Sequence, residues 1–305
     1  MSRLRDIVRS VVLPPVWPGT VERPPVRPNI GLDYDTAWTR TPIARAARAA
    51  VFDGVASHII GFVASPTLIG SEMLDELDTP VIFASNHSSH LDTTLILGAL
   101  PSAIRRKTVV AAAADYFFDR TWKAVASSLL LGAIPIERTR VNRQSADIAS
   151  ALISEGWNLV IFDEGGRSPD GWGQAFRGGA AYIAKRSGAA VVPLHLDGAR
   201  AIFPKGSKRI TPGTVTIRFG RPMFPLPASD TEREEDARHF ALRIETAVSV
   251  LADEAESDWW SARRRAAKGE TPAYRGPEAA PWRRAWAVPA NRRQDSSTRR
   301  TVKPW

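Results

Sequence analysis

The segment NHSSHLD, residues 86–92, contains two side chains that together could move a proton. His87 and Asp92 are five positions apart, and on a straight helix this spacing turns the two side chains roughly 140° from each other. They can pair if His87 lies in a turn after a strand and Asp92 lies in the first turns of the following helix. A carboxylate on one imidazole nitrogen fixes the tautomer and leaves the other nitrogen to accept a proton from a substrate hydroxyl. The spacing therefore allows two members of a catalytic triad, with the alcohol supplied by the substrate.

Two other roles are open to the same segment. A histidine with a carboxylate at this spacing can be a buried structural pair with no catalytic task. His87, His90 and Asp92 are also suitable ligands for zinc or iron, which would make the chain a metal-dependent hydrolase. No downstream cluster with ligand spacing completes the set, although His195 is available, so we expect no metal site.

Two loops further along the chain could bind an anion. GAIPIERTR places Arg138 just after a short apolar run. FDEGGRSPDG places Glu164, Gly165 and Arg167 in a turn after another apolar run. An arginine fork can grip phosphate oxygens, and glycines let backbone N–H groups approach closely. Glu164 could orient Arg167 or accept a hydrogen bond from a hydroxyl, although each loop alone would also fit an exposed arginine in a tight turn.

Four segments in this order, NHSSHLD, IERTR, FDEGGRS and VVPLHLDG, resemble the four sequence blocks of the glycerolipid acyltransferase family, which includes the 1-acylglycerol-3-phosphate acyltransferases. The similarity covers roughly residues 70–225. The resemblance implies that His87 is the general base, that Asp92 orients it, and that Pro193 shapes the acyl side of the pocket. It implies that the acceptor's glycerophosphate is surrounded by Arg138, Glu164, Gly165 and Arg167.

The third block departs from the usual family pattern at two positions. The family commonly has a proline before the glutamate and a threonine after the glycine, where this chain has Asp163 and Gly166. The change removes a hydroxyl donor, and Asp163 adds a negative charge close to where a phosphate would lie. A different lysophospholipid or another alcohol therefore remains open as the acceptor.

Short apolar runs that alternate with helical patterns predict a sheet layered by helices. We expect a single α/β domain over residues 71–255, with a mostly parallel or mixed central sheet flanked by helices. The predicted strands are residues 80–86, 107–114, 133–139, 158–165, 189–198 and 215–220. The predicted helices are residues 88–100, 143–155, 174–187 and a last one from about 231, where Thr231 and Glu234 form a capping box.

The first 70 residues have no features of a catalytic domain. Residues 1–35 are a proline-rich leader without the apolar core of a secretory signal. Residues 36–70 form an amphipathic helix that could pack on the domain or lie among lipid head groups, with Arg40, Arg45 and Arg48 on lipid phosphates. Asp53 and His58 interrupt its apolar stretch, so we expect no helix that crosses a membrane. Its apolar positions are Ile43, Ala47, Val51, Val55, Ile59, Phe62 and Val63.

The C-terminal residues 256–305 form a basic, tryptophan-rich tail that we expect to be poorly ordered. From Trp259 onward there are twelve Lys and Arg against three Asp and Glu, which accounts for the whole net charge of +9. Such a tail could meet nucleic acid or anionic lipid, or could simply solubilise the chain. Tryptophans beside basic residues favour an anionic membrane surface, and we expect no nucleic-acid partner.

Together these features predict transfer of a fatty acyl group from acyl-coenzyme A or acyl carrier protein to a hydroxyl of a glycerolipid, with 1-acylglycerol-3-phosphate as the favoured lysophospholipid acceptor. The base would act directly on the acceptor, so neither an acyl-enzyme nor a cofactor is required. The absence of cysteine excludes a thiol nucleophile. We expect a peripheral protein on the cytoplasmic face of the cell membrane. A non-catalytic lipid-binding protein would share many of these features but would not turn over a thioester.

Overall fold

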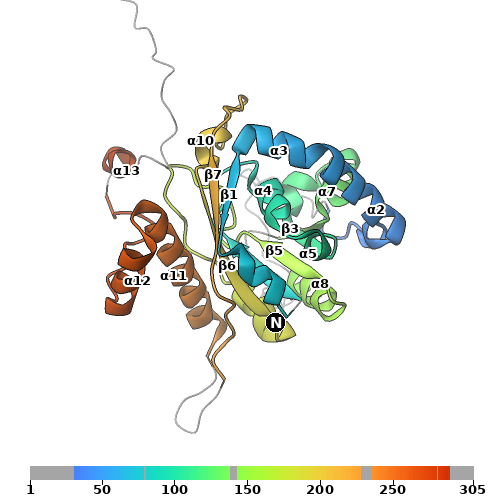
Figure 1. The fold of residues 1–305 in the computed structure, drawn as a ribbon. Helices are drawn as coiled ribbons and strands as arrows, with labels where there is room; N and C mark the ends of the chain where they lie inside the picture. Colours follow the sequence, from blue (N-terminus) through green and yellow to red (C-terminus); the bar gives the residue numbers. More distant parts are fainter. Residues whose placement is uncertain (1–30, 79, 138–142, 228–234, 280, 289–305) are drawn as a thin grey trace, which may run out of the picture. The chain divides into compact units, whose positions relative to one another are not determined.

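The computed structural model describes residues 31–78, 80–137, 143–227, 235–279 and 281–288. Most of the predicted leader therefore lies outside the described residues. A seven-stranded sheet with the strand order β1-β7-β6-β2-β5-β3-β4 forms the centre of the fold (Figure 1). Only the β6–β7 pair in this sheet is antiparallel. The strands are β1 (Pro66–Ile69), β2 (Val81–Ser85), β3 (Thr108–Ala113), β4 (Ala133–Ile136), β5 (Asn158–Ile161), β6 (Ala190–Asp197) and β7 (Val215–Phe219).

Helices cover both faces of the sheet, so the predicted α/β fold is confirmed. Alternate residues of β2 point to opposite faces: Phe83 joins the core beneath α3 and α4, whereas Ile82 joins the core beneath α8, α9 and α11. This explains why the strand is buried at every position and apolar from Val81 to Ala84. The described helices are η1 (Ala37–Arg40), α2 (Pro42–Val51), η2 (Phe52–Ala56), α3 (Ser57–Ala64), η3 (Ser71–Glu76), α4 (Asp92–Ala99), α5 (Ser102–Arg105), α6 (Ala114–Phe117), α7 (Thr121–Leu131), α8 (Arg143–Ser154), α9 (Gly179–Ser187), α10 (Ala199–Ile202), α11 (Ala237–Glu256), α12 (Trp259–Lys268) and α13 (Pro281–Ala287).

Several element boundaries differ from the prediction. Strand β1 was missed because all four of its residues are exposed, so it carries no buried pattern. Helix α4 begins at Asp92 rather than at residue 88, because residues 88–91 form a turn. Helix α9 begins at Gly179 rather than at residue 174, since residues 174–178 have no regular structure and Gly178 adopts a left-handed backbone conformation. The proposed capping box at residues 231–234 lies outside the described residues.

The predicted amphipathic helix is present, and the structure shows which of its faces packs on the domain. α2 and α3 run as one helix through the π-helical turn η2. Its predicted apolar face is turned outward, with Ile43 84% and Phe62 81% exposed. Arg48, which one of the two alternatives placed among lipid head groups, is buried on the side that packs on the domain. Among the described residues, Pro42–Ala64 is the one helix long and apolar enough to cross a membrane, contrary to the expectation from sequence.

The C-terminal segment is better ordered than expected as far as the structure describes it. Helix α12 begins after Asp258, whose carboxylate accepts a hydrogen bond of 2.9 Å from the Ser261 N–H. Arg265 makes two hydrogen bonds, of 2.8 and 2.7 Å, to Asp253 of α11. Ion pairing and capping thus order a sequence whose composition indicated disorder. The exposed tryptophans of this segment are Trp259, Trp260, Trp282 and Trp286.

Candidate active site

His87 and Asp92 meet at the turn between β2 and α4. His87 Nδ1 lies 2.8 Å from Asp92 Oδ2. The same oxygen accepts hydrogen bonds from the backbone N–H groups of Ser88, at 2.7 Å, and Ser89, at 2.8 Å. Asp92 is fully buried, so its charge is held by these donors rather than by water. The turn closes the five-residue spacing as the sequence analysis required.

The geometry determines which imidazole nitrogen is available for chemistry. An ionised carboxylate can only accept hydrogen bonds, so Nδ1 of His87 carries the proton and Nε2 is the basic nitrogen. The ring is stacked on Phe162, with centroids 4.1 Å apart, which restricts its rotation. His87 lines a cavity of about 470 Å³, where a substrate could reach it.

His90 has a different environment from His87. Its Nε2 is in direct contact with Nη1 of Arg167, and its backbone N–H donates to the carbonyl of Phe203. Burial, and then the charge of Arg167, lower the pKa of His90. His90 is therefore a poorer base than its place in the motif suggested. Within the described ranges, no three His, Asp or Glu side chains gather as metal ligands.

The FDEGGRS loop clamps the backbone of His87 from both sides. Ser168 N–H donates to the His87 carbonyl at 2.7 Å. On the other side, His87 N–H donates to Glu164 Oε1 at 3.2 Å. The loop therefore fixes the position of the catalytic candidate through main-chain contacts, which no motif spacing indicated.

Glu164 lies behind His87 rather than beside the cavity. It is 1% exposed and is not one of the residues that line the cavity, so the predicted contact with the acceptor is not found. Its other donors are the Gln174 N–H at 3.1 Å and the Tyr274 hydroxyl at 2.9 Å. Burial raises the pKa of Glu164 to about 8, although all three hydrogen bonds oppose the rise. Glu164 is thus a buried support for His87.

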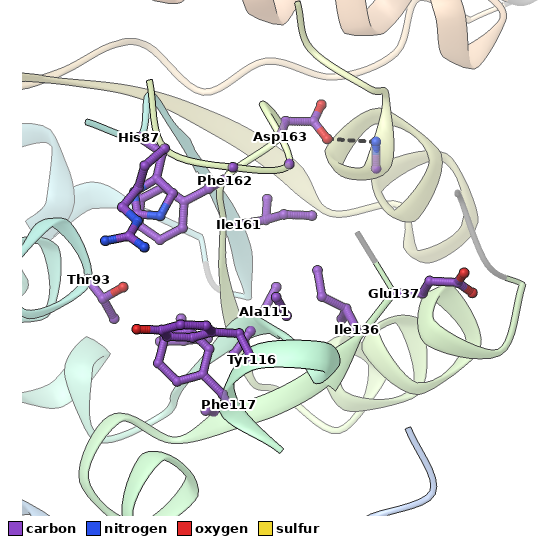
Figure 2. Close-up of a pocket in the computed structure, with 18 of the residues that line it drawn as sticks. His87, Thr93, Ala111, Tyr116, Phe117, Ile136, Glu137, Ile161, Phe162 and Asp163 are labelled. Atoms are coloured by element: carbon purple, nitrogen blue, oxygen red, sulfur yellow. Dashed lines mark hydrogen bonds between the residues drawn. The ribbon is translucent and has the colours of Figure 1, made fainter. Parts of the chain in front are cut away.

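Asp163 directs its charge toward the start of α9. Its carboxylate accepts hydrogen bonds from the N–H groups of Gly178, Gly179 and Ala180, at 3.2, 2.7 and 3.2 Å, and Figure 2 shows one of these contacts. Burial raises the pKa of Asp163 to about 6, while these donors lower it. The aspartate that replaces the usual proline therefore caps a helix, where its charge is favourable. The predicted conflict with a bound phosphate is reduced accordingly.

The remaining predicted anion ligands divide into two groups. Gly165 and Arg167 line the cavity, whereas Arg138 lies outside the described residues. Arg177, which the sequence analysis missed, also lines the cavity, and its Nε donates to the Glu164 carbonyl at 3.3 Å. Its signal was the FRGG segment shortly after the third block.

The cavity is polar at one end and apolar over much of its wall. Figure 2 shows His87 opposite Tyr116 and Phe117, with Ile136 further along. Pro193, expected on the acyl side, does not line it, because it lies within β6 and packs against Gly220. Aliphatic walls of this kind suit a hydrocarbon chain. The apolar lining residues are Val110, Ala111, Ala112, Ala113, Phe117, Leu131, Ala133, Ile136, Ile161 and Phe162.

Residues 65–197 match the family model described as Acyltransferase. This range holds the histidine, its aspartate, the FDEGGRS loop and most of the cavity wall. This part of the chain is similar to an acyltransferase domain. The resemblance seen in the sequence is thereby confirmed.

Curated relatives and a solved structure show the same similarity. The chain is 27% identical over 213 residues to the 1-acyl-sn-glycerol-3-phosphate acyltransferase of Cocos nucifera, covering 67% of this chain and 63% of that protein. It is 31% identical over 159 residues to a chloroplastic enzyme of the same description from Arabidopsis thaliana, covering 50% and 42%. It thus spans less than two thirds of these relatives. The crystal structure of the 1-acyl-sn-glycerophosphate acyltransferase PlsC from Thermotoga maritima shares the fold, with a TM-score of 0.53, 22% identity, and coverage of 73% of this chain and 84% of that one.

Outside the matched range, a C-terminal segment of the chain, residues 274–284, is hydrogen-bonded to the FDEGGRS loop and its continuation. Gly173 N–H donates to the Tyr274 carbonyl at 3.2 Å. Arg284 accepts from Trp172 Nε1 at 3.0 Å through its carbonyl, and its guanidinium pairs with Asp170 at 2.9 Å. The sequence analysis did not predict these contacts, because they join residues that are about 110 positions apart.

Proposed function

We propose that this chain transfers a fatty acyl group from an acyl thioester to a hydroxyl of 1-acylglycerol-3-phosphate. The observation that carries the proposal is the His87–Asp92 pair, oriented so that its basic nitrogen serves a cavity with a cationic end and aliphatic walls. The printed activity of the curated relatives supports the same acceptor. The thioester would come from coenzyme A or from acyl carrier protein.

The reaction follows from the two ring nitrogens of His87. Nε2 takes the proton of the acceptor hydroxyl while its oxygen attacks the thioester carbonyl. The tetrahedral intermediate collapses, the carbon–sulfur bond breaks, and the thiolate takes the proton from the imidazolium. Asp92 stabilises that imidazolium through Nδ1, as a triad aspartate does. The acyl group passes directly to the acceptor, so every proton and electron pair is accounted for without an acyl-enzyme.

The acceptor phosphate would bind at the cationic end of the cavity, which is formed by Arg167 and Arg177. Arg167 and Arg177 both line it, and guanidinium forks suit phosphate oxygens. Asp163 opposes this binding little, because its carboxylate is directed at α9. Arg138, which follows the lining residue Glu137, completes the proposed set. A lysophospholipid with a larger head group is the second candidate acceptor, since the cationic end recognises phosphate alone.

We further propose that the protein lies on an anionic membrane surface, on its cytoplasmic face. The outward residues of α2 and α3 are apolar, while their inward face packs on the domain. A helix held along one side by its own domain suits the interface rather than a span across the bilayer. The exposed tryptophans of α12 and α13 offer a second contact, because tryptophan favours the head-group level.

A thiol-release assay tests the activity. Acyl-coenzyme A and acyl carrier protein thioesters are offered with 1-acylglycerol-3-phosphate, other lysophospholipids and glycerol phosphate. We expect release to depend on an acceptor and to be lost in His87→Ala. His239→Ala removes an exposed histidine on α11 and should keep full activity. Full turnover in His87→Ala would contradict the mechanism, and turnover that requires added divalent metal would favour the hydrolase instead.

A further inference from the structure

Arg48 is a buried cation without a partner in the described part of the chain. It is 8% exposed, yet neither Nη1 nor Nη2 makes a hydrogen bond. Burial, followed by the positive charges of Arg45 and Arg40, lowers the pKa of Arg48, so the fold works against its charged form. Removing a cation from water without a counter-charge is strongly unfavourable, and proteins normally pair such groups. An anion that is not among the described residues would supply the missing counter-charge to Arg48.

Arg48 faces a small cavity of about 20 Å³ between α2, α5 and α7. Four arginines line this space, two from α2 and two from the end of α5. A volume of this size holds one water-sized group, so a single oxygen of a larger anion could enter while the rest stays at the mouth. The lining residues are Arg45, Arg48, Ala49, Phe52, Leu97, Arg105, Arg106, Thr108, Leu130 and Leu131.

The charges around the cavity do not balance within the described residues. Asp53 is the carboxylate that pairs with this cluster: it contacts Arg105 directly and lies 3.8 Å from Arg106. The Nε of Arg45 donates a hydrogen bond to the carbonyl of Arg106, and its guanidinium lies over the ring of Trp157. One carboxylate thus faces four guanidinium groups, which leaves an excess of positive charge centred on Arg48.

The chemistry and position of the cluster select the class of ligand. Guanidinium groups that converge from different directions suit the tetrahedral oxygens of phosphate. Arg48 lies on the inward side of the same helix that exposes Ile43 and Val51. A head-group phosphate beside an interfacial helix would therefore lie within reach of the cluster.

We propose that Arg45, Arg48 and Arg106 form a phosphate-binding site on the inward side of α2, distinct from the catalytic cavity. One phosphate oxygen enters the space beside Arg48, and the others meet Arg45 and Arg106 at the surface. The ligand is a lipid head-group phosphate or a free phosphate. Leu131 lines both cavities, which places the site next to the catalytic one. The site does not depend on the acyl-transfer proposal, but a lipid head group as its ligand rests on the proposed membrane contact of α2 and α3.

Thermal unfolding in the presence of inorganic phosphate tests the site. In phosphate-free buffer, Arg48→Met should match or exceed the wild-type Tm, because it removes an unpaired buried charge. Phosphate at about fivefold above its Kd should raise the wild-type Tm by about 2–4 °C relative to chloride of equal ionic strength. Arg48→Met should lose this rise, and Arg106→Gln should reduce it. Arg238→Gln removes an exposed arginine on α11 and should keep it.

Vesicle flotation separates the two sources of phosphate. If the site takes a lipid head group, Arg48→Met should lower partition to phosphatidylglycerol vesicles by about fivefold, while Arg238→Gln changes it less than twofold. If the site takes a soluble anion, partition stays equal and only the thermal response is lost.

Three outcomes would overturn the site. One is a wild-type response to phosphate no greater than that to chloride, together with equal partition of all variants. The second is an Arg48→Met protein that still responds to phosphate as the wild type does. The third is an Arg106→Gln protein whose Tm rises with phosphate as much as that of the wild type. If Arg48→Met does not fold, Arg106→Gln decides, because its side chain is 54% exposed and its loss spares the core.

Discussion

The hydroxyl of Tyr274 donates a hydrogen bond of 2.9 Å to Oε1 of Glu164, across 110 positions of the chain. The same oxygen accepts from the backbone N–H of His87. Tyr274, in the C-terminal segment, therefore positions the Glu164 side chain. Glu164 in turn accepts a hydrogen bond from the backbone of His87, the proposed base. The position of His87 therefore depends on Tyr274, which lies outside the residues that match the family model.

Replacing Tyr274 with phenylalanine should lower kcat by about fivefold and leave KM nearly unchanged. The ring and its packing remain, but a buried carboxylate oxygen loses a donor, which costs about 1–3 kcal/mol. His87 is then held less firmly, while the cavity walls are unaltered. Steady-state kinetics and denaturant unfolding measure the two effects. Tyr182→Phe on α9 is the matched control, and an equal loss in both variants would argue against the role of Tyr274.

Asp92→Asn should reduce kcat by about 10³–10⁴-fold while the protein stays folded. An amide nitrogen turned toward His87 would force the proton onto Nε2, which is the wrong tautomer for a base. The backbone N–H groups of Ser88 and Ser89 would also lose part of their acceptor, so the Tm should fall. Kinetics together with circular dichroism check both points. Near-normal turnover in this variant would mean that the pair is structural.

Glu164 should make stability fall as pH rises. Its pKa is raised to about 8 in the fold from a reference value of 4.5, so the folded state binds the proton more tightly than the unfolded state does. The stabilisation is complete below about pH 4.5 and is lost as pH rises to about 8. We expect a decline on the order of 2–5 kcal/mol. Urea unfolding between pH 5 and 8 should show it, and Glu164→Gln should flatten the profile. A profile unchanged by this substitution would show that other groups dominate.

Phe62→Asp should reduce partition to lipid vesicles by about 10-fold or more without loss of fold. The side chain is 81% exposed on α3, so the substitution leaves the core intact. Burying an aromatic side chain in the interface contributes about 1.5–3 kcal/mol, which the charged residue forfeits. Vesicle flotation measures the change. Leu242→Asp alters an exposed leucine on α11 and should bind as the wild type does; equal losses would contradict a specific role for α3.

Local sequence patterns predicted the features that depend on near neighbours. His87 and Asp92 are joined by a turn of a few residues, so their types and spacing were enough to anticipate the pair. Buried strands such as β2 and β5 are mostly apolar short runs and were found for the same reason. Strand β1 was missed because an exposed edge strand is not required to be apolar.

Long-range contacts were outside the reach of these patterns. Glu164 has the residue type of an acceptor ligand, yet its partners on three different segments turn it into a support for His87. Asp163 was expected to repel phosphate, but the start of α9 takes up its charge. Each role depends on what lies opposite the side chain in the fold.

The sequence by itself determined the resemblance to acyltransferases, the sheet layered by helices, and the pairing of His87 with Asp92, since these follow from order, periodicity and short spacing. Only the tertiary structure decided which way α2 faces and why Arg48 is buried. A helical period reports that one face differs from the other, but not which face meets the core. That choice depends on the packing energy of the whole domain, to which residues far apart in the chain contribute together.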